Sequence, residues 1–143
     1  MATVRQLLDR KGHSVLTIGP ENTVFDAIEK MAKHNIGSLV VMEGETLVGL
    51  IDERLYTRNV ILKGRSSPNT PVKDIMAERV ICALPEQSVE ECMAVMTKKA
   101  VRHLPVLEGN RVVGIISIGD LVNHIISDQK FIIEQLEHYI AGQ

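Results

Sequence analysis

Residues 102–120 read RHLPVLEGNRVVGIISIGD, and residues 37–55 read GSLVVMEGETLVGLIDERL. The two stretches lie 65 residues apart and align without a gap. A match of this kind is typical of a supersecondary unit that occurs twice in one chain. The identical pairs are Leu39 and Leu104, Val41 and Val106, Glu43-Gly44 and Glu108-Gly109, Val48-Gly49 and Val113-Gly114, and Ile51 and Ile116.

The same shift continues the match upstream to residue 15. The further identical pairs are Val15 and Val80, Pro20-Glu21 and Pro85-Glu86, Val24 and Val89, Met31 and Met96, and Lys33 and Lys98. We therefore predict the same order of strands and helices in each copy. The fold class is α/β (α+β), with two tandem β-α-β-β-α repeats.

The predicted elements follow from local patterns. Thr23-x-x-Asp26 and Ser88-x-x-Glu91 have the form of capping boxes, and apolar residues follow them at helical spacing. Glu43-Gly44-Glu45 and Glu108-Gly109-Asn110 predict hairpin turns. The predicted strands are residues 15–18, 38–42, 46–51, 80–83, 103–107 and 111–117, and a helix closes each copy.

Two such units should associate. The strands are nearly continuous apolar runs, which indicates sheets covered by helices on at least one face. A unit of about 50 residues buries too little surface to be stable alone, so we expect the copies to pack about a pseudo-two-fold axis.

The chain divides at a loop of residues 66–71, SSPNTP, which has the composition of a linker. We place the first repeat, with an N-terminal helix at residues 4–10, in residues 1–65. The second repeat occupies residues 72–143, begins with a short helix at residues 72–76, and ends in a long C-terminal helix.

Composition excludes several classes of protein. The net charge is −2 and no basic stripe carries interleaved aromatic residues, which argues against nucleic acid as a partner. We expect no membrane segment and no secretory signal, since no apolar run has the required length. Cys82 and Cys92 lack metal-ligand spacing, so we expect reduced thiols in the cytoplasm and no metal site.

The run Arg102-His103-Leu104-Pro105-Val106, followed by residues 114–121, resembles the second half of a CBS domain. Asp74-Ile75-Met76 resembles the segment that precedes such a domain. The likeness covers both copies, so the chain resembles a tandem CBS pair, or Bateman module. Its tail, from Asp120 through residues 134–139, resembles that of small stand-alone bacterial proteins that consist of such a pair alone. The resemblance implies two clefts related by the pseudo-two-fold axis, and adenosine ligands such as AMP, ADP, ATP, NAD or S-adenosylmethionine.

The resemblance also implies roles for residues of the second copy. Ser117-x-x-Asp120 matches the family signature, in which the carboxylate accepts ribose hydroxyls and the hydroxyl contacts ribose or phosphate; Asp120 could also be only a helix cap. Arg102 and His103 are expected to reach phosphate. Cys82 and Ala83 are expected to present backbone groups to adenine, whereas packing is the more natural role for Pro105 and Ile116.

The first copy departs from this signature. Asp52 takes the place of Ser117, and Leu55 takes the place of Asp120. A nucleotide in the matching orientation would lose its ribose acid and meet a carboxylate near its phosphate. Lys63 and Arg65 could clamp phosphates in either cleft, or could simply be solvated charges at a helix end near Gly64.

The C-terminal helix, residues 121–140, carries apolar residues at near-helical spacing: Leu121, Ile125, Ile132, Leu136 and Tyr139. This pattern predicts an apolar face that meets a second subunit, and the resemblance to CBS pairs implies a homodimer. The leading hypothesis is a regulatory module for signal transduction that senses an adenine nucleotide, with AMP favoured, and acts in trans on an effector protein. The alternative is a structural or protein-interaction dimer whose ligand sites have decayed. No motif for catalysis or for a catalytic cofactor is present, so we expect that the protein is not an enzyme.

Overall fold

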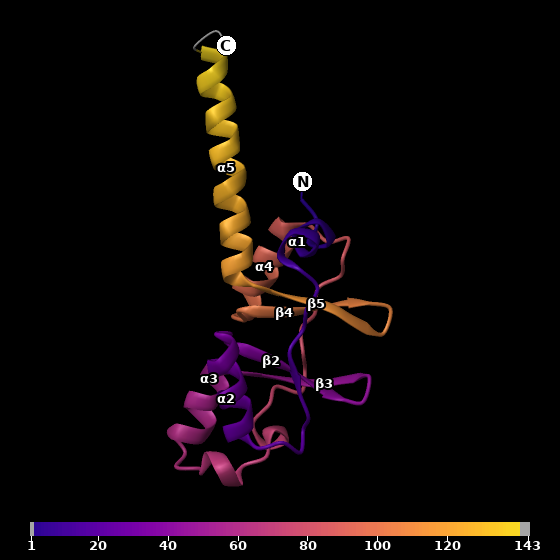
Figure 1. The fold of residues 1–143 in the computed structure, drawn as a ribbon, viewed down its shortest axis with the longest axis vertical. Helices are drawn as coiled ribbons and strands as arrows, with labels where there is room; N and C mark the ends of the chain where they lie inside the picture. Colours follow the sequence, from indigo (N-terminus) through magenta and orange to yellow (C-terminus); the bar gives the residue numbers. More distant parts are fainter. Residues whose placement is uncertain (1, 141–143) are drawn as a thin grey trace.

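The computed structural model describes residues 2–140, with side chains up to His138. The first repeat contains β1 (Thr17–Ile18), α2 (Val24–His34), β2 (Ser38–Glu43), β3 (Thr46–Asp52) and α3 (Glu53–Tyr56), which a π-helical turn (Thr57–Ile61) extends. The second contains α4 (Val89–Lys99), β4 (His103–Glu108), β5 (Arg111–Ser117) and α5 (Ile118–Ile140). Before them lie α1 (Val4–Lys11) and the 3-10 turns η2 (Ser67–Asn69) and η3 (Val72–Asp74). The predicted α/β class with tandem repeats is confirmed (Figure 1).

The two hairpins are near copies of each other. β2 pairs antiparallel with β3 and β4 with β5, and the register slips at the same place, after Val41 and after Val106. Both turns are closed by a glycine with positive φ, 62° at Gly44 and 63° at Gly109, where a side chain would be strained. The predicted hairpin turns are therefore confirmed.

The predicted strand at residues 80–83 is wrong. In the first repeat the N–H of Val40 donates to the carbonyl of Leu16, and β1 pairs parallel to β2. The position that corresponds to Val40 is Pro105, which has no N–H to donate. The second repeat accordingly keeps only a single parallel bridge, between Ala83 and Val106.

Capping boxes begin α2 and α4, the equivalent helices of the two repeats. The N–H of Asp26 donates to Thr23 Oγ1 over 3.1 Å, and the N–H of Glu91 donates to Ser88 Oγ over 3.0 Å. The apolar residues that follow each cap at helical spacing bury one side of the helix. The buried residues are Val24, Ala27 and Met31 in α2, and Val89, Cys92 and Met96 in α4.

The segments that precede each repeat pack onto the other repeat. Val4, Leu7 and Leu8 of α1 belong to the core of the second repeat, and α1 lies beside α4 rather than beside α2 (Figure 1). Conversely, Val72 and Ile75, in and just after η3, belong to the core of the first repeat. The domain boundaries drawn from the sequence stay a prediction, but the helix assigned to the first repeat packs on the second. The segment predicted as a helix over residues 72–76 is the short 3-10 turn η3.

The segments that lead into the repeats, α1 and η3, are thus exchanged between them. Hydrogen bonds show that this exchange of lead-in segments is symmetric. The N–H of Val4 donates to the carbonyl of Gln87, and the N–H of Val72 donates to the carbonyl of Asn22, both over 2.8 Å. The bridges between Thr3 and Ser88 and between Pro71 and Thr23 are related in the same way. The two repeats are thus tied together at both ends by equivalent contacts.

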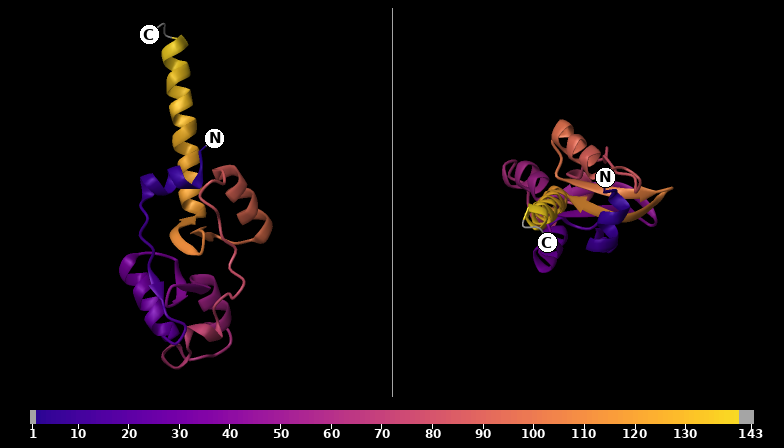
Figure 2. Two further views of the ribbon diagram at one scale, coloured as in Figure 1. Left: turned by 90° about the vertical axis from the view of Figure 1, so that its right-hand side faces the viewer. Right: turned by 90° about the horizontal axis from the view of Figure 1, so that it is seen from above.

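The start of α5 packs on the second repeat, and the rest of the helix extends away from the body of the molecule (Figures 1 and 2). Leu121 is fully buried, and every described residue from Ile126 to His138 is exposed. Within residues 2–140, no helix combines the length and the apolar character needed to cross a membrane.

Candidate functional site

A cleft of about 520 Å³ lies between the two repeats. One wall comes from the segment after α1 and the other walls come from the α2–β2 junction and the second repeat. The lining residues are Lys11, Gly12, Ser14, Leu16, Asn35, Ile36, Gly37, Ser38, His103, Ile115, Ser117 and Asp120. Asp120, Ser117 and His103, all predicted site residues, are therefore brought together.

Asp120 and Ser117 form a reciprocal cap at the start of α5. The N–H of Ser117 donates to Asp120 Oδ2 over 2.8 Å, and the N–H of Asp120 donates to Ser117 Oγ over 3.1 Å. The cap fixes the carboxylate at the lip of the cleft, next to a helix N-terminus that favours negative charge. The capping role considered from the sequence is thus present, and it still leaves Oδ1 without a bond to any described residue.

Lys11 reaches this carboxylate from the end of α1. Its Nζ donates to Asp120 Oδ2 over 2.7 Å and to the carbonyl of Ile115 over 2.6 Å. Partial burial works to raise the pKa of Asp120, but the bonds from Lys11 and Ser117 outweigh it and hold that pKa below its ordinary value. Asp120 is therefore a charged acceptor at neutral pH.

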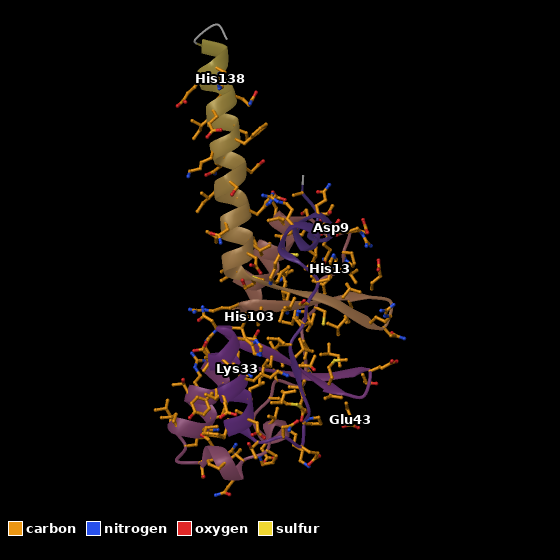
Figure 3. The ribbon with its side chains drawn as sticks, in the orientation of Figure 1. Asp9, His13, Lys33, Glu43, His103 and His138 are labelled. Carbon is orange, nitrogen blue, oxygen red and sulfur yellow. The ribbon has the colours of Figure 1, made fainter. Side chains whose placement is uncertain are left out.

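His103 lies at the start of β4, between the two repeats (Figure 3). Its ring is half-buried, and Nδ1 is enclosed without a hydrogen-bond partner among the described residues. Burial lowers the pKa of His103, although the carboxylates of Asp52 and Asp120 act in the opposite direction. The imidazole is consequently neutral at physiological pH, and its ring contributes hydrogen-bonding capacity rather than charge.

Four other predicted site residues do not line the cleft. Ile116 is fully buried in the second core and Pro105 is buried beside it, which fits the packing role. Ala83 is also buried; its N–H donates to the carbonyl of Pro105 and its carbonyl accepts the N–H of Leu107, so its N–H is already used within the second repeat. Cys82 is half-buried, with its thiol near the carbonyl of Val80.

The three basic residues predicted to contact phosphate, Arg102, Lys63 and Arg65, also lie outside the lining of the cleft. Arg102 is exposed, and its carbonyl accepts the N–H of Ile118 at the start of α5. Lys63 and Arg65 are exposed beyond the π-helical turn, on either side of Gly64, whose φ is 68°. None of the three lines the cleft, and their phosphate contacts stay predictions.

The first repeat has different chemistry at the equivalent place. Asp52 caps α3 by accepting the N–H of Leu55 over 2.8 Å. Arg54 crosses to the second repeat and donates to the carbonyl of Ala100 over 3.2 Å. The residue that corresponds to Arg54 is Gly119. Because Gly119 has no side chain, no equivalent contact crosses between the repeats beside the cleft that Ser117 and Asp120 line.

Lys11, Ser14, Leu16 and Ser38 line the cleft but were not predicted. Ser38 could have been found, because it is the counterpart of His103 under the 65-residue shift. Lys11 could not have been found in this way, since it reaches Asp120 only because α1 packs on the other repeat.

Comparison with known proteins identifies the family. The CBS-domain family model matches residues 4–55 and 72–127. The chain therefore belongs to the CBS-domain family, with two CBS domains in tandem.

Individual relatives agree with this assignment. The chain is 38% identical over 149 residues to the mitochondrial CBS domain-containing protein CBSX3 of Arabidopsis thaliana, covering 98% of this chain and 72% of that one. It is 30% identical over 116 residues to the CBS domain-containing protein YhcV of Bacillus subtilis, covering 81% and 82%. A solved structure from Burkholderia ambifaria, described as a candidate signal-transduction protein with CBS domains, superposes with a TM-score of 0.87 at 45% identity and covers 90% and 96%. These likenesses support a regulatory module.

Proposed function

We propose that the cleft binds an adenine nucleotide, with AMP the favoured ligand, and that the protein is a regulatory module acting in trans on an effector protein. The observation that carries this proposal is the geometry of Asp120. Its Oδ2 is held by Lys11 and Ser117, and its Oδ1 is available to accept the hydroxyls of a ribose.

The rest of the cleft suits the same ligand. Leu16, Ile36 and Ile115 provide apolar surface for a flat base, while Ser117 and Lys11 provide polar contacts at one end. The volume of about 520 Å³ lies in the range of small-molecule sites. ADP, ATP, NAD and S-adenosylmethionine share the adenosine part, so the same chemistry extends to them as alternatives.

Calorimetric titration and thermal unfolding with these five compounds test the proposal. A ligand at 100 times its Kd should stabilise the fold by about 2.7 kcal/mol. Asp120→Asn should weaken binding by at least about tenfold, because a neutral amide accepts the ribose hydroxyls less strongly.

Glu91→Gln is the matched control. It makes the same carboxylate-to-amide change at the same position of a capping box, but at the start of α4, and Glu91 does not line the cleft. It should leave the Kd unchanged. If none of the five compounds stabilises the protein, or if both variants weaken binding equally, the cleft is not an adenosine site.

A homodimer is the second proposal, and α5 favours it. Exposed apolar side chains continue along α5 from its start on the second repeat into the part that extends away. They are Ile118, Val122, Ile126, Phe131, Ile132, Ile133 and Leu136, between 38% and 61% exposed. The apolar face predicted for this helix from the sequence divides into two parts. Leu121 and Ile125 pack on the second repeat, whereas Ile132 and Leu136 are exposed. Tyr139 lies outside the described side chains.

Sedimentation equilibrium tests this proposal. The protein should sediment as a dimer, and the double variant Ile132→Glu, Leu136→Glu should sediment as a monomer, since a charge at an apolar interface is costly. Lys130→Glu, on the same helix, should remain dimeric. A monomeric wild type would contradict the proposal, and a dimer that lacks any adenosine ligand would favour the purely structural role. The cytoplasmic location stays a prediction.

A further inference from the structure

One wall of the cleft is a connecting segment. Residues 11–16, the strap, run from the last residue of α1, which packs on the second repeat, to β1 of the first repeat. The strap residues that line the cleft are Lys11, Gly12, Ser14 and Leu16. A ligand in the cleft would therefore contact the strap, and its affinity should depend on where the strap lies.

The internal repeat shows that the strap is attached differently from its counterpart. Ala77, the counterpart of Gly12 under the 65-residue shift, donates its N–H to the carbonyl of Leu50 over 2.8 Å and accepts the N–H of Leu50 over 3.0 Å. Ile115 of β5 is the counterpart of Leu50, yet residues 11–16 share no backbone hydrogen bond with β5. Gly12 instead has φ of 111° and nothing within 4 Å of the place where a Cβ would be, so the backbone can turn there.

Two side chains replace that backbone pairing. Lys11 Nζ donates to the carbonyl of Ile115 over 2.6 Å, and His13 Nδ1 lies 3.1 Å from the carbonyl of Val113. On the other side of its ring, His13 Nε2 lies 3.0 Å from Asp9 Oδ1, one turn earlier in α1 (Figure 3). The strap is therefore held on β5 by a lysine and a histidine rather than by a strand ladder.

Both ring nitrogens of His13 face acceptors. A backbone carbonyl has no proton to donate, and an ionised carboxylate has none either. The neutral imidazole carries a single N–H, so both hydrogen bonds form together only when the ring is protonated. The bond with Asp9 and the bond with Val113 raise the pKa of His13, while desolvation and the charge of Arg5 in α1 act against them.

From this geometry we infer that His13 is a proton-dependent latch on the strap, so that the cleft binds its ligand more tightly when His13 is protonated. The inference rests on the proposed function, in which the cleft holds the adenosine part of a nucleotide. Loss of the proton leaves one of the two acceptors without a donor and loosens the strap. A ligand that fits only the latched strap then binds with an apparent affinity reduced by the fraction that is unlatched.

The pH range of this effect differs from that of two other titratable groups in the cleft. Burial lowers the pKa of His103, and hydrogen bonds hold the pKa of Asp120 below its ordinary value. Between about pH 6.5 and pH 8.5, His103 is therefore neutral and Asp120 charged. Adenosine carries no phosphate and does not titrate in this range, so a change in its affinity reports on the protein.

Calorimetric titration of the full chain with adenosine at about pH 6.5, 7.5 and 8.5 tests the inference. The Kd of the wild type should rise about threefold over this range, as expected for the loss of one ordinary hydrogen bond. His13→Gln, whose neutral amide does not titrate, should show a flat profile. His34→Gln makes the same change at an exposed histidine in the last turn of α2, outside the cleft, and should keep the profile of the wild type.

An NMR titration of the His13 ring tests the latch in the absence of ligand. The pKa of His13 should lie above the ordinary histidine value of about 6.5. Asp9→Asn should lower that pKa, because a neutral amide stabilises the imidazolium less than a carboxylate does.

The outcomes separate the latch from the proposed function. Adenosine binding with the same pH profile in the wild type and in His13→Gln overturns the latch and leaves the adenosine cleft in place. A His13 pKa that is unchanged in Asp9→Asn also overturns the latch. If adenosine binds at no pH, the proposed function is overturned, and the dependence of ligand affinity on His13 is overturned with it.

Discussion

Replacing Leu8 by alanine removes a side chain of α1 that is only 1% exposed in the core of the second repeat. Leu8 lies directly over Gly114 of β5: a Cβ built on that glycine would be 2.6 Å from Leu8 Cδ2 and 2.7 Å from Cδ1. These two positions therefore share one volume, and the effect of a substitution at either should depend on the other.

The magnitudes follow from this shared volume. Leu8→Ala should cost about 3 kcal/mol of unfolding free energy and lower Tm by about 10 °C, because it leaves a cavity. Gly114→Ala alone should cost about 1–3 kcal/mol through overpacking. In the Leu8→Ala background the same methyl group fills the cavity, so Gly114→Ala should be neutral or stabilising.

Urea unfolding of the wild type, the two single variants and the double variant measures this coupling, which should be about 1–3 kcal/mol. Gly114 does not have a positive φ, so alanine is compatible with its backbone. If Gly114→Ala costs the same in both backgrounds, α1 does not pack over β5 in solution and the exchange of lead-in segments is refuted.

Three further predictions concern the first repeat and the titratable residues of the cleft. Gly49→Ala should lower the unfolding free energy more than Gly114→Ala does. Besides the Met76 side chain, the added methyl would meet the backbone carbonyl of Ala77 at 2.9 Å, and a backbone atom cannot move aside as a side chain can. Thermal unfolding of the two variants ranks them. Because its bonds hold the pKa of Asp120 below the ordinary value, its stabilising effect should be complete above the ordinary carboxyl pKa and should be lost as pH falls through the lowered one. The difference in unfolding free energy between the wild type and Asp120→Asn, measured by urea titration, should therefore shrink from pH 7 to pH 3. A difference that stays constant would contradict this. Because burial lowers the pKa of His103, the unfolded chain takes up its proton more readily, and stability should fall as pH drops below about 6.5; His103→Asn should show a shallower fall between pH 7 and pH 5, and an identical profile would refute the assignment.

Much of the fold could be predicted because it is local. Capping boxes, hairpin glycines and apolar runs are encoded within a few residues, and the repeat confirms each pattern twice. The absence of a strand at residues 80–83 follows from Pro105, which lies in another strand, so it can be predicted only when the pairing partner of that proline is known. Local patterns state what a segment can form, and pairing decides whether it does.

Three residues that line the candidate site were predicted. Ser117, His103 and Asp120 could be located because they lie within one repeat and within the two runs of it that resemble a CBS domain. Lys11 could not, since its position depends on which repeat α1 packs against. The 65-residue shift relates equivalent positions but contains no information about contacts between the two copies.

The exchange of lead-in segments also affects how the chain could be divided. A cut in the loop of residues 66–71 would yield one fragment that carries α1, which packs in the core of the other, and a second fragment that carries η3, which packs in the core of the first. Each fragment would hold a piece of its neighbour's interior and lack a piece of its own. The two CBS domains are thus separate units in sequence that should fold as a single cooperative unit, and the halves should recover native structure only when mixed.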